Sequence, residues 1–174
     1  MTADISVRTA RPEETEAVRE ILAAAYGQYE AEFPTENWLR YREDILDIES
    51  RAEISELLVA EREGELVGCV SYYPPGAETS YPSESYSEHW PSDFAAIRLL
   101  GVGPAARGGG IGRALTIECI ERARNDSATA VGLHTTKEMA VARAMYERMG
   151  FQRAPRYDFR PSPQIFVEAY SLTL

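Results

Sequence analysis

The chain is poor in cysteine and histidine and has no long hydrophobic run: two cysteines and two histidines occur in 174 residues. Cys69 and Cys119 lie in apolar segments with no metal-ligand spacing around them, which favours buried reduced thiols over a disulfide or a catalytic thiol. No apolar run approaches the ~20 residues that span a bilayer, and no basic segment precedes an apolar core at the N-terminus. We therefore expect a cytoplasmic protein with no bound metal and no membrane contact.

Positive charge is also scarce, because 18 Lys and Arg stand against 28 Asp and Glu, giving a net charge of −10. Nucleic-acid binding needs a cationic face, so we expect no nucleic-acid partner. The acidity fits a cationic amine ligand, and it equally fits a protein kept soluble by its charge. The hydrophobic content of 44% and the length are typical of one globular domain covering residues 1–174.

Glycine is concentrated in one place, the run Arg107-Gly108-Gly109-Gly110-Ile111-Gly112-Arg113. An apolar segment at 97–102 precedes it and predicts a strand, while apolar residues at helical spacing follow at 114–123. Backbone N–H groups converge in such a strand, turn and helix, and the helix N-terminus adds its positive dipole end. Glycines let the backbone approach a phosphate closely. The run therefore predicts a pyrophosphate site.

Two common phosphate-binding motifs do not fit this run. No Lys-Ser or Lys-Thr follows the glycines, as a P-loop requires, and the dinucleotide pattern G-x-G-x-x-G fails at Arg113 and at Leu115. The pattern that fits is R-x-x-G-x-G, formed by Arg107, Gly110 and Gly112. Downstream, residues 142–151 carry A-x-x-x-Y on a predicted helix followed by Gly-Phe. With these two motifs in this order, the chain resembles the GNAT acetyltransferase superfamily.

The hydrophobic pattern predicts an α/β domain, and the resemblance implies a mixed, centrally splayed β-sheet flanked by helices. Leu39, Ile45 and Leu46 are expected to face inward from the second helix. Residues 74–93 follow neither period, and 155–163 are expected to form a loop. The predicted strands cover 5–10, 56–61, 66–73, 97–102, 130–135, 151–153 and 165–174, and the helices cover 12–25, 38–48, 114–123 and 137–149.

The resemblance also implies the donor, acetyl-CoA, and the residues that hold it. Backbone N–H groups of the glycine run would bind the pyrophosphate, Gly112 would pack its helix closely, and the backbones of one strand would pair with the pantetheine amides. A backbone N–H of that strand would polarise the thioester carbonyl. Met139 stands where many relatives carry an asparagine that binds pantetheine. The cofactor-binding residues expected are Leu100, Val102, Arg107, Gly108, Gly109, Gly110, Ile111, Gly112 and Arg113.

Tyr146 occupies the position of the family's tyrosine acid, and a phenol can donate a proton or a hydrogen bond to a departing thiolate. The general base stays open between Asp93, His134 and water, and a structural role for His134 at a strand end is a further alternative. Candidates for the acceptor side are Glu30, Glu32, Tyr26, Tyr29, Trp38, Tyr81, Tyr86 and Trp90.

The sequence therefore predicts an N-acetyltransferase that moves an acetyl group from acetyl-CoA to a primary amine by direct attack in a ternary complex. The acceptor would be a small-molecule or peptide amine. The alternative is a non-catalytic acyl-CoA-binding or sensing module. The resemblance leaves a homodimer open, because dimers are common in the family.

Overall fold

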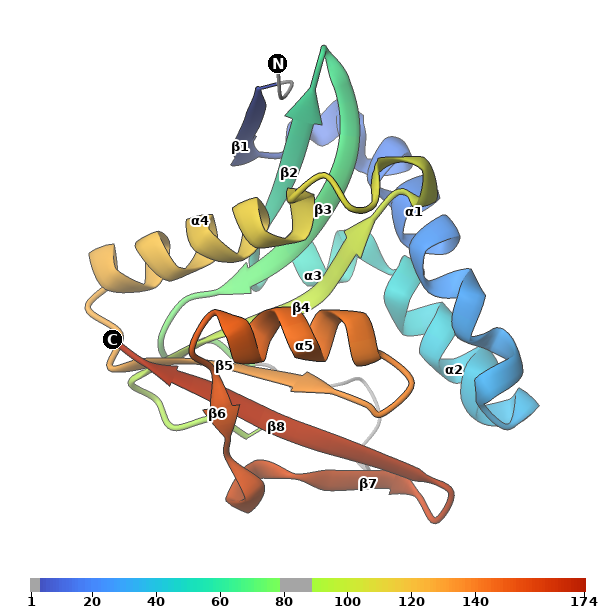
Figure 1. The fold of residues 1–174 in the computed structure, drawn as a ribbon, viewed down its shortest axis with the longest axis vertical. Coiled ribbons are helices and arrows are strands. Elements are labelled where there is room, and N and C mark those ends of the chain that lie inside the picture. The colour runs from blue at the N-terminus through green and yellow to red at the C-terminus, as the bar shows by residue number, and fades with distance from the viewer. Residues whose placement is uncertain (1–3, 79–88) are drawn as a thin grey trace.

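The computed structural model describes residues 4–78 and 89–174, whose strands form one mixed sheet (Figure 1). The strand order is β1-β2-β3-β4-β5-β8-β6, with β7 paired to β8. Among the strand pairs of the described residues, only the central pair, β4 and β5, is parallel. This confirms the predicted mixed α/β architecture. The strands are β1 (Ile5–Thr9), β2 (Glu56–Arg62), β3 (Glu65–Tyr73), β4 (Phe94–Val102), β5 (Ala130–Thr135), β6 (Gln152–Arg153), β7 (Phe159–Ser162) and β8 (Ile165–Thr173).

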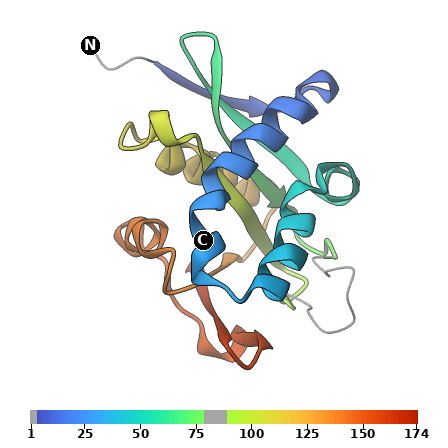
Figure 2. The same ribbon diagram turned by 90° about the vertical axis from the view of Figure 1, so that its right-hand side faces the viewer.

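Helices cover both faces of the sheet (Figures 1 and 2). On one face lie α1 (Thr15–Tyr26), α2 (Thr35–Leu46) and the short α3 (Ile48–Ala52). On the other face lie α4 (Ile111–Asn125) and α5 (Ala140–Arg148). Each layer has its own apolar core, one around Val18 and Leu22 and the other around Leu115 and Leu133. None of the helices in the described residues is long and apolar enough to cross a membrane.

Two strand glycines set how closely the helices approach the sheet. A Cβ at Gly68 of β3 would lie 2.7 Å from Ile111 Cγ2, at the first residue of α4. A Cβ at Gly101 of β4 would lie 3.0 Å from Leu22 Cδ2 of α1. Both distances are shorter than ordinary contacts, so a side chain at either position would require the neighbouring residue to move. The N-terminus of α4 and the last turns of α1 are thereby held against opposite faces of the β3–β4 pair.

The sheet splits between β4 and β5. Their parallel pairing runs from Phe94 opposite Ala130 to Ile97 opposite Leu133, and β4 then continues to Val102 without β5 beside it. The two strands diverge beyond this point in Figure 1. The predicted central splay is therefore confirmed, and it opens at the carboxyl ends of two parallel strands, where α/β folds commonly bind ligands.

Some details differ from the sequence prediction. Leu39 is 60% exposed, so its inward placement is wrong, because Trp38 and Ile45 define the buried stripe of α2 and Leu39 is rotated about 100° from Trp38. The expected loop at 155–163 contains β7, whose Pro161 is tolerated because β7 is an edge strand. Helix α2 also begins earlier than predicted, at Thr35, and α4 begins inside the glycine run at Ile111.

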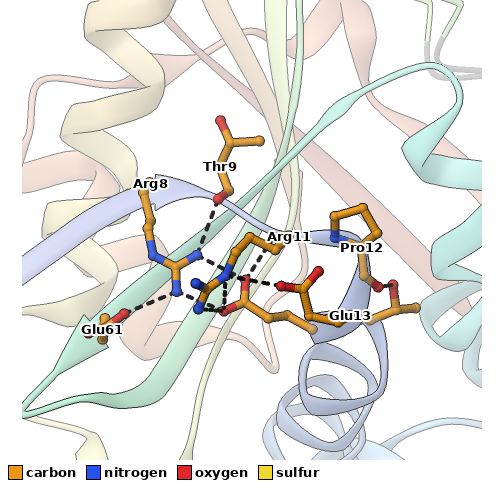
Figure 3. Close-up of polar contacts among 8 residues, drawn as sticks. Arg8, Thr9, Arg11, Pro12, Glu13 and Glu61 are labelled. Carbon is orange, nitrogen blue, oxygen red and sulfur yellow. Dashed lines mark hydrogen bonds and ion pairs between the residues drawn. The ribbon is translucent and has the colours of Figure 1, made fainter.

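The N-terminal strand is joined to the fold by a charged network (Figure 3). Glu14, at the end of a 3₁₀ turn (Pro12–Glu14), accepts hydrogen bonds from Arg8 at 2.7 and 2.9 Å and from Arg11 Nη2 at 2.8 Å. Arg8 also contacts Glu61 of β2 at 3.0 Å. These contacts link β1, the start of α1 and β2, and none of these four charged residues borders the splay.

Candidate functional site

The glycine run forms a loop whose backbone donors are free. Gly108 and Gly110 have φ values of +77° and +79°, a region that L side chains rarely adopt, and Gly110 is the N-cap of α4. The first bond of the helix is Ala114 N–H to the Gly110 carbonyl, at 2.9 Å. Within the described residues, no N–H group from Arg107 to Arg113 donates a hydrogen bond. Free donors at a helix N-terminus form a site for an anion.

Arginines surround this loop although the chain carries a net charge of −10. Arg113 on α4 and Arg148 at the end of α5 have no ion pair or hydrogen bond among the described residues. Among the described residues, the side chain of Arg107 donates hydrogen bonds only to the Ala25 carbonyl, at 3.3 Å, and to Gln28 Oε1, at 3.5 Å. Positive charge is therefore available for a polyanion, and Arg148 was not identified from the sequence.

The last half of β4 departs from regular strand geometry. Cys69 of β3 is opposite Gly101 and Ser71 is opposite Arg98, so two β4 residues face Val70 alone. One of the two, Leu99, has a φ of +53°. This is a β-bulge, and it lies directly after the last β4–β5 pair. The sequence carries no signal for this bulge.

Tyr146 forms part of the α5 wall of the splay. It is 5% exposed and its ring lies 5.6 Å from that of Phe151. Among the described residues no hydrogen bond engages its hydroxyl, although the residue lines the cleft. Burial raises the pKa of Tyr146, so the phenol stays protonated at neutral pH. The group can act as a donor and not as a base.

These features border one cleft of about 1160 Å³. Its glycine-loop end is formed by the loop and by the facing sides of α4 and α5. Its other end, here called the α2–β8 end, lies between α2 and the β7–β8 pair. Its side chains include Tyr41 and Asp44 from α2 and Phe159, Ile165 and Val167 from β7 and β8. The cleft therefore runs from a basic, main-chain surface to a mixed aromatic, aliphatic and acidic one.

A buried ion pair lies at the α2–β8 end. Arg98 Nη2 of β4 is 3.2 Å from Asp44 Oδ2, and the two side chains are 7% and 16% exposed. Arg51 holds the backbone there, donating to the carbonyls of Asp44 at 2.7 Å and Ile45 at 2.8 Å. Sequence reasoning missed this pair, because its members lie 54 positions apart on different elements.

Most of the predicted cofactor residues border the cleft together. Leu100, Val102, Arg107, Gly108, Gly110, Ile111, Gly112, Arg113 and Tyr146 all line it. Gly109 does not, and a Cβ there would lie 2.8 Å from Arg62 Nη1. A Cβ at Gly112 would lie 3.4 Å from Met145 Sδ, which is an ordinary contact distance. The packing of α4 against α5 at Gly112 is therefore less close than expected. Met139 lines the cleft with an apolar side chain.

The candidate bases differ in position. Asp93 is exposed at the start of β4, accepts a hydrogen bond from the Thr129 hydroxyl at 2.7 Å and does not line the cleft. His134 does line it, but its Nε2 lies 2.9 Å from the Tyr157 carbonyl. Because a carbonyl only accepts, Nε2 carries the proton. The ring also packs against Trp90 at 4.8 Å and Phe159 at 5.0 Å. This geometry fits the structural alternative for His134.

The acceptor-side candidates are divided. Tyr26 and Tyr29 line the cleft. Glu30, Glu32 and Trp38 do not, and Trp38 is a core residue. Trp90 packs over Gly132 and lies outside the main cleft, and Tyr81 and Tyr86 fall outside the described residues. In the part of the chain that the structure describes, no cluster of His, Cys, Asp or Glu side chains is arranged to hold a metal.

Comparison with known proteins identifies relatives of this chain. A model of the acetyltransferase (GNAT) family matches residues 15–151. An IAA acetyltransferase from Azospirillum brasilense is 32% identical over 127 residues, which are 71% of this chain and 74% of that protein. A mycothiol acetyltransferase from Acidothermus cellulolyticus is 36% identical over 94 residues, which are 54% of this chain and 29% of that protein. The chain thus matches less than a third of the length of the mycothiol acetyltransferase.

A solved structure shares the fold. A GNAT family acetyltransferase from Brucella melitensis, in complex with acetyl-CoA, aligns with a TM-score of 0.61 at 20% identity, covering 99% of this chain and 89% of that one. The family model matches most of the chain, and both of the motifs found in the sequence lie within that match. The protein therefore belongs to the acetyltransferase (GNAT) family.

Proposed function

We propose that the protein is an N-acetyltransferase that moves an acetyl group from acetyl-CoA to a primary amine. The observation that carries this proposal is the row of free N–H groups from Arg107 to Arg113 at the N-terminus of α4, opening into the cleft. Such a surface fits the pyrophosphate of coenzyme A. Arg113 and Arg148 add positive charge that would attract the third phosphate of coenzyme A, the one outside the pyrophosphate. Relatives named acetyltransferases and a fold neighbour that contains acetyl-CoA support the choice of donor.

The splay provides the place for the pantetheine arm. Beyond Ile97 the β4 edge has no β5 partner, so its backbone groups at Leu100 and Val102 can pair with amides of an extended ligand. The Leu100 carbonyl already accepts a hydrogen bond from the Tyr26 hydroxyl, at 3.1 Å. Pairing in this proposal therefore relies on Val102 and on the Leu100 N–H group. Met139 contributes apolar contact to the arm.

The reaction needs one new bond and one broken bond. The amine nitrogen attacks the thioester carbon, the C–N bond forms, the C–S bond breaks, and the electron pair leaves with sulfur. A backbone N–H of the β4 bulge polarises the carbonyl as negative charge develops on its oxygen. Tyr146 donates its proton to the departing sulfur, which leaves as the thiol, and the resulting phenolate takes a proton back from water.

The proton of the amine goes to water in this proposal. Asp93 lies outside the cleft. The His134 Nε2 is engaged by a carbonyl, and Nδ1, the nitrogen that could accept a proton, is buried and not exposed to a bound amine. The cleft is wide enough to hold water beside a bound amine, which can also bind as the free base. The acceptor itself is a small-molecule or peptide amine held at the α2–β8 end.

The test combines binding and turnover. Acetyl-CoA at ~100 times its dissociation constant should stabilise the protein by about 2.7 kcal/mol and raise its Tm by roughly 5 °C or more. CoA should act similarly, and ATP and NAD should not. Thiol release is then followed with a panel of amino sugars, amino acids, polyamines and arylalkylamines. A shift without amine-dependent thiol release would instead favour the binding or sensing module, and no shift with any CoA species would end both readings.

Tyr146→Phe tests the donor to sulfur. Because only the hydroxyl is removed, kcat should fall roughly 10- to 100-fold while acetyl-CoA affinity changes little. Tyr170→Phe is the matched control: its hydroxyl contacts Glu147 on the same helix, at 3.1 Å, and Tyr170 does not line the cleft. An unchanged kcat in Tyr146→Phe would remove Tyr146 from the mechanism.

A further inference from the structure

The β4 bulge reverses the side-chain alternation of the strand. Ile97, Leu100 and Val102 pack into the core beneath α4. Arg98 pairs with Asp44 of α2, and Leu99 belongs to the core beneath α1. Two consecutive side chains therefore point to the same face, which a regular strand does not allow. The left-handed φ of +53° at Leu99 makes this possible.

This conformation is unfavourable for leucine and needs support from its surroundings. A non-glycine residue in the left-handed region costs of order 1 kcal/mol or more, and such residues persist only where neighbouring structure holds them. The bulge also takes Leu99 and Leu100 out of regular register with β3. A backbone carbonyl in this half-buried position needs another donor.

Tyr26 supplies that donor. It is the last residue of α1, is 8% exposed, and its hydroxyl donates to the Leu100 carbonyl at 3.1 Å. Its ring packs edge-to-face against the rings of Tyr29 and Tyr41, with ring centroids 6.1 and 6.0 Å apart. The same side chain packs in one core with Leu99. Tyr26 thus belongs to the same apolar core as the strained Leu99 and also donates a hydrogen bond to the carbonyl of the next residue, Leu100.

We propose that Tyr26 is a positioning residue, whose hydroxyl fixes the Leu100 carbonyl and thereby holds the Leu99 bulge in the orientation that presents the β4 backbone to the thioester. This inference rests on the proposed function. Tyr26 does not contact the reacting atoms in this scheme and acts through the bulge. Burial raises the pKa of Tyr26 well above its ordinary value, which keeps the hydroxyl a donor across the working pH range.

Tyr26→Phe removes the hydroxyl and keeps the ring. Turnover is measured with acetyl-CoA and hydroxylamine, a nucleophile small enough to need no acceptor site. We expect kcat to fall roughly 10- to 100-fold, because a displaced bulge misplaces the carbonyl donor. The acetyl-CoA dissociation constant should rise much less than kcat falls, by no more than about fivefold, because only the Leu100 N–H contact is displaced while the glycine loop and Val102 are untouched.

The matched control is Tyr72→Phe. Tyr72 is fully buried, its hydroxyl donates to Asp126 at 2.6 Å, and it does not line the cleft. Both variants lose one partly buried hydrogen bond and some stability, but only Tyr26→Phe should lose turnover. Equal kcat in Tyr26→Phe and wild type, or equal losses of kcat in the two variants, would overturn the proposal.

Amide hydrogen exchange separates this inference from the proposed function. In the free protein, Tyr26→Phe should speed exchange at residues 99–101 while Tyr72→Phe should not. If wild type fails to bind acetyl-CoA but exchange changes as expected, the proposed function is wrong and the support of the bulge by Tyr26 stands. If acetyl-CoA is turned over and exchange at 99–101 is unchanged, the role of Tyr26 is wrong.

Discussion

The two ends of the cleft are built from different chemistry. At the glycine-loop end the surface is main chain, namely the free N–H groups of residues 107–113 at the start of α4. At the α2–β8 end it is side chain, including Asp44 from α2 and Val167 from β8. The first surface is encoded by one contiguous run, while the second joins segments more than 100 residues apart. The comparison explains why the donor can be proposed as a single molecule while the acceptor is proposed only as a class.

The largest effect should come from Gly110→Asp at the glycine-loop end. Gly110 has a φ of +79° and is the N-cap of α4, so the change adds backbone strain and a carboxylate where the pyrophosphate should bind. Acetyl-CoA affinity should fall about 100-fold, through lost N–H contacts and repulsion of like charge. Titration calorimetry measures this directly.

Gly64→Asp is the control for strain. Gly64 has a φ of +83°, a Cβ there would meet nothing within 4 Å, and it lies at the β2–β3 turn away from the cleft. Gly110→Asn then separates charge from shape, because asparagine tolerates the left-handed region. Undiminished acetyl-CoA binding by Gly110→Asp would refute the anion site.

This contrast also shows what a sequence can predict about the fold. The positive φ values at positions 108 and 110 favour glycine, so the loop was predictable from its glycines. Most residues of 97–102 are buried in β4, so the strand was predictable from its apolar side chains. The family resemblance predicts the splay between β4 and β5, and the end of their pairing at Ile97 confirms it.

Features that depend on tertiary contacts could not be predicted. The bulge at Leu99 has no glycine to mark it, because Tyr26 and the surrounding core support it from another element. The sequence predicts a loop where β7 lies, because Pro161 hides the strand pattern. Hydrophobicity alone predicts that Leu39 faces inward, but its neighbour Trp38 occupies the buried face of α2. The catalytic and cofactor roles of the site residues stay predictions.

A smaller effect is expected from Val167→Ala at the α2–β8 end. Val167 lines the cleft with a half-buried side chain, so the change should weaken apolar contact with the acceptor and raise its KM roughly 3- to 10-fold. The acetyl-CoA dissociation constant should not change, because the glycine-loop end is intact. The assay uses the best amine from the panel.

Phe166→Ala is the neighbouring control, because Phe166 is exposed, stacks under Arg160 at 4.7 Å and does not line the cleft. If Val167→Ala weakens the binding of acetyl-CoA and of the amine equally, the two ends of the cleft do not bind their ligands independently.

The smallest effect should come from Glu14→Gln, which lies in neither end of the cleft. Arg8, Arg11 and Glu14 are paired, whereas Arg113 and Arg148 at the glycine-loop end have no such partners among the described residues. Losing the Glu14 charge should lower the free energy of unfolding by about 1 kcal/mol, because these hydrogen bonds are charge-assisted but partly exposed. Acetyl-CoA affinity should be unchanged.

The pH dependence of this loss identifies its cause. Hydrogen bonds from Arg8, then those from Arg11, hold the pKa of Glu14 below its ordinary value of 4.5 in the folded protein. The folded state therefore keeps the carboxylate charged where the unfolded chain binds a proton. The stability from this group is complete above pH 4.5 and is lost as the pH falls further. Denaturant unfolding at pH 7, 5, 4 and 3 should show a constant gap between wild type and Glu14→Gln at the two higher values and a shrinking gap below them. A gap that does not vary with pH would mean that Glu14 contributes packing and not charge.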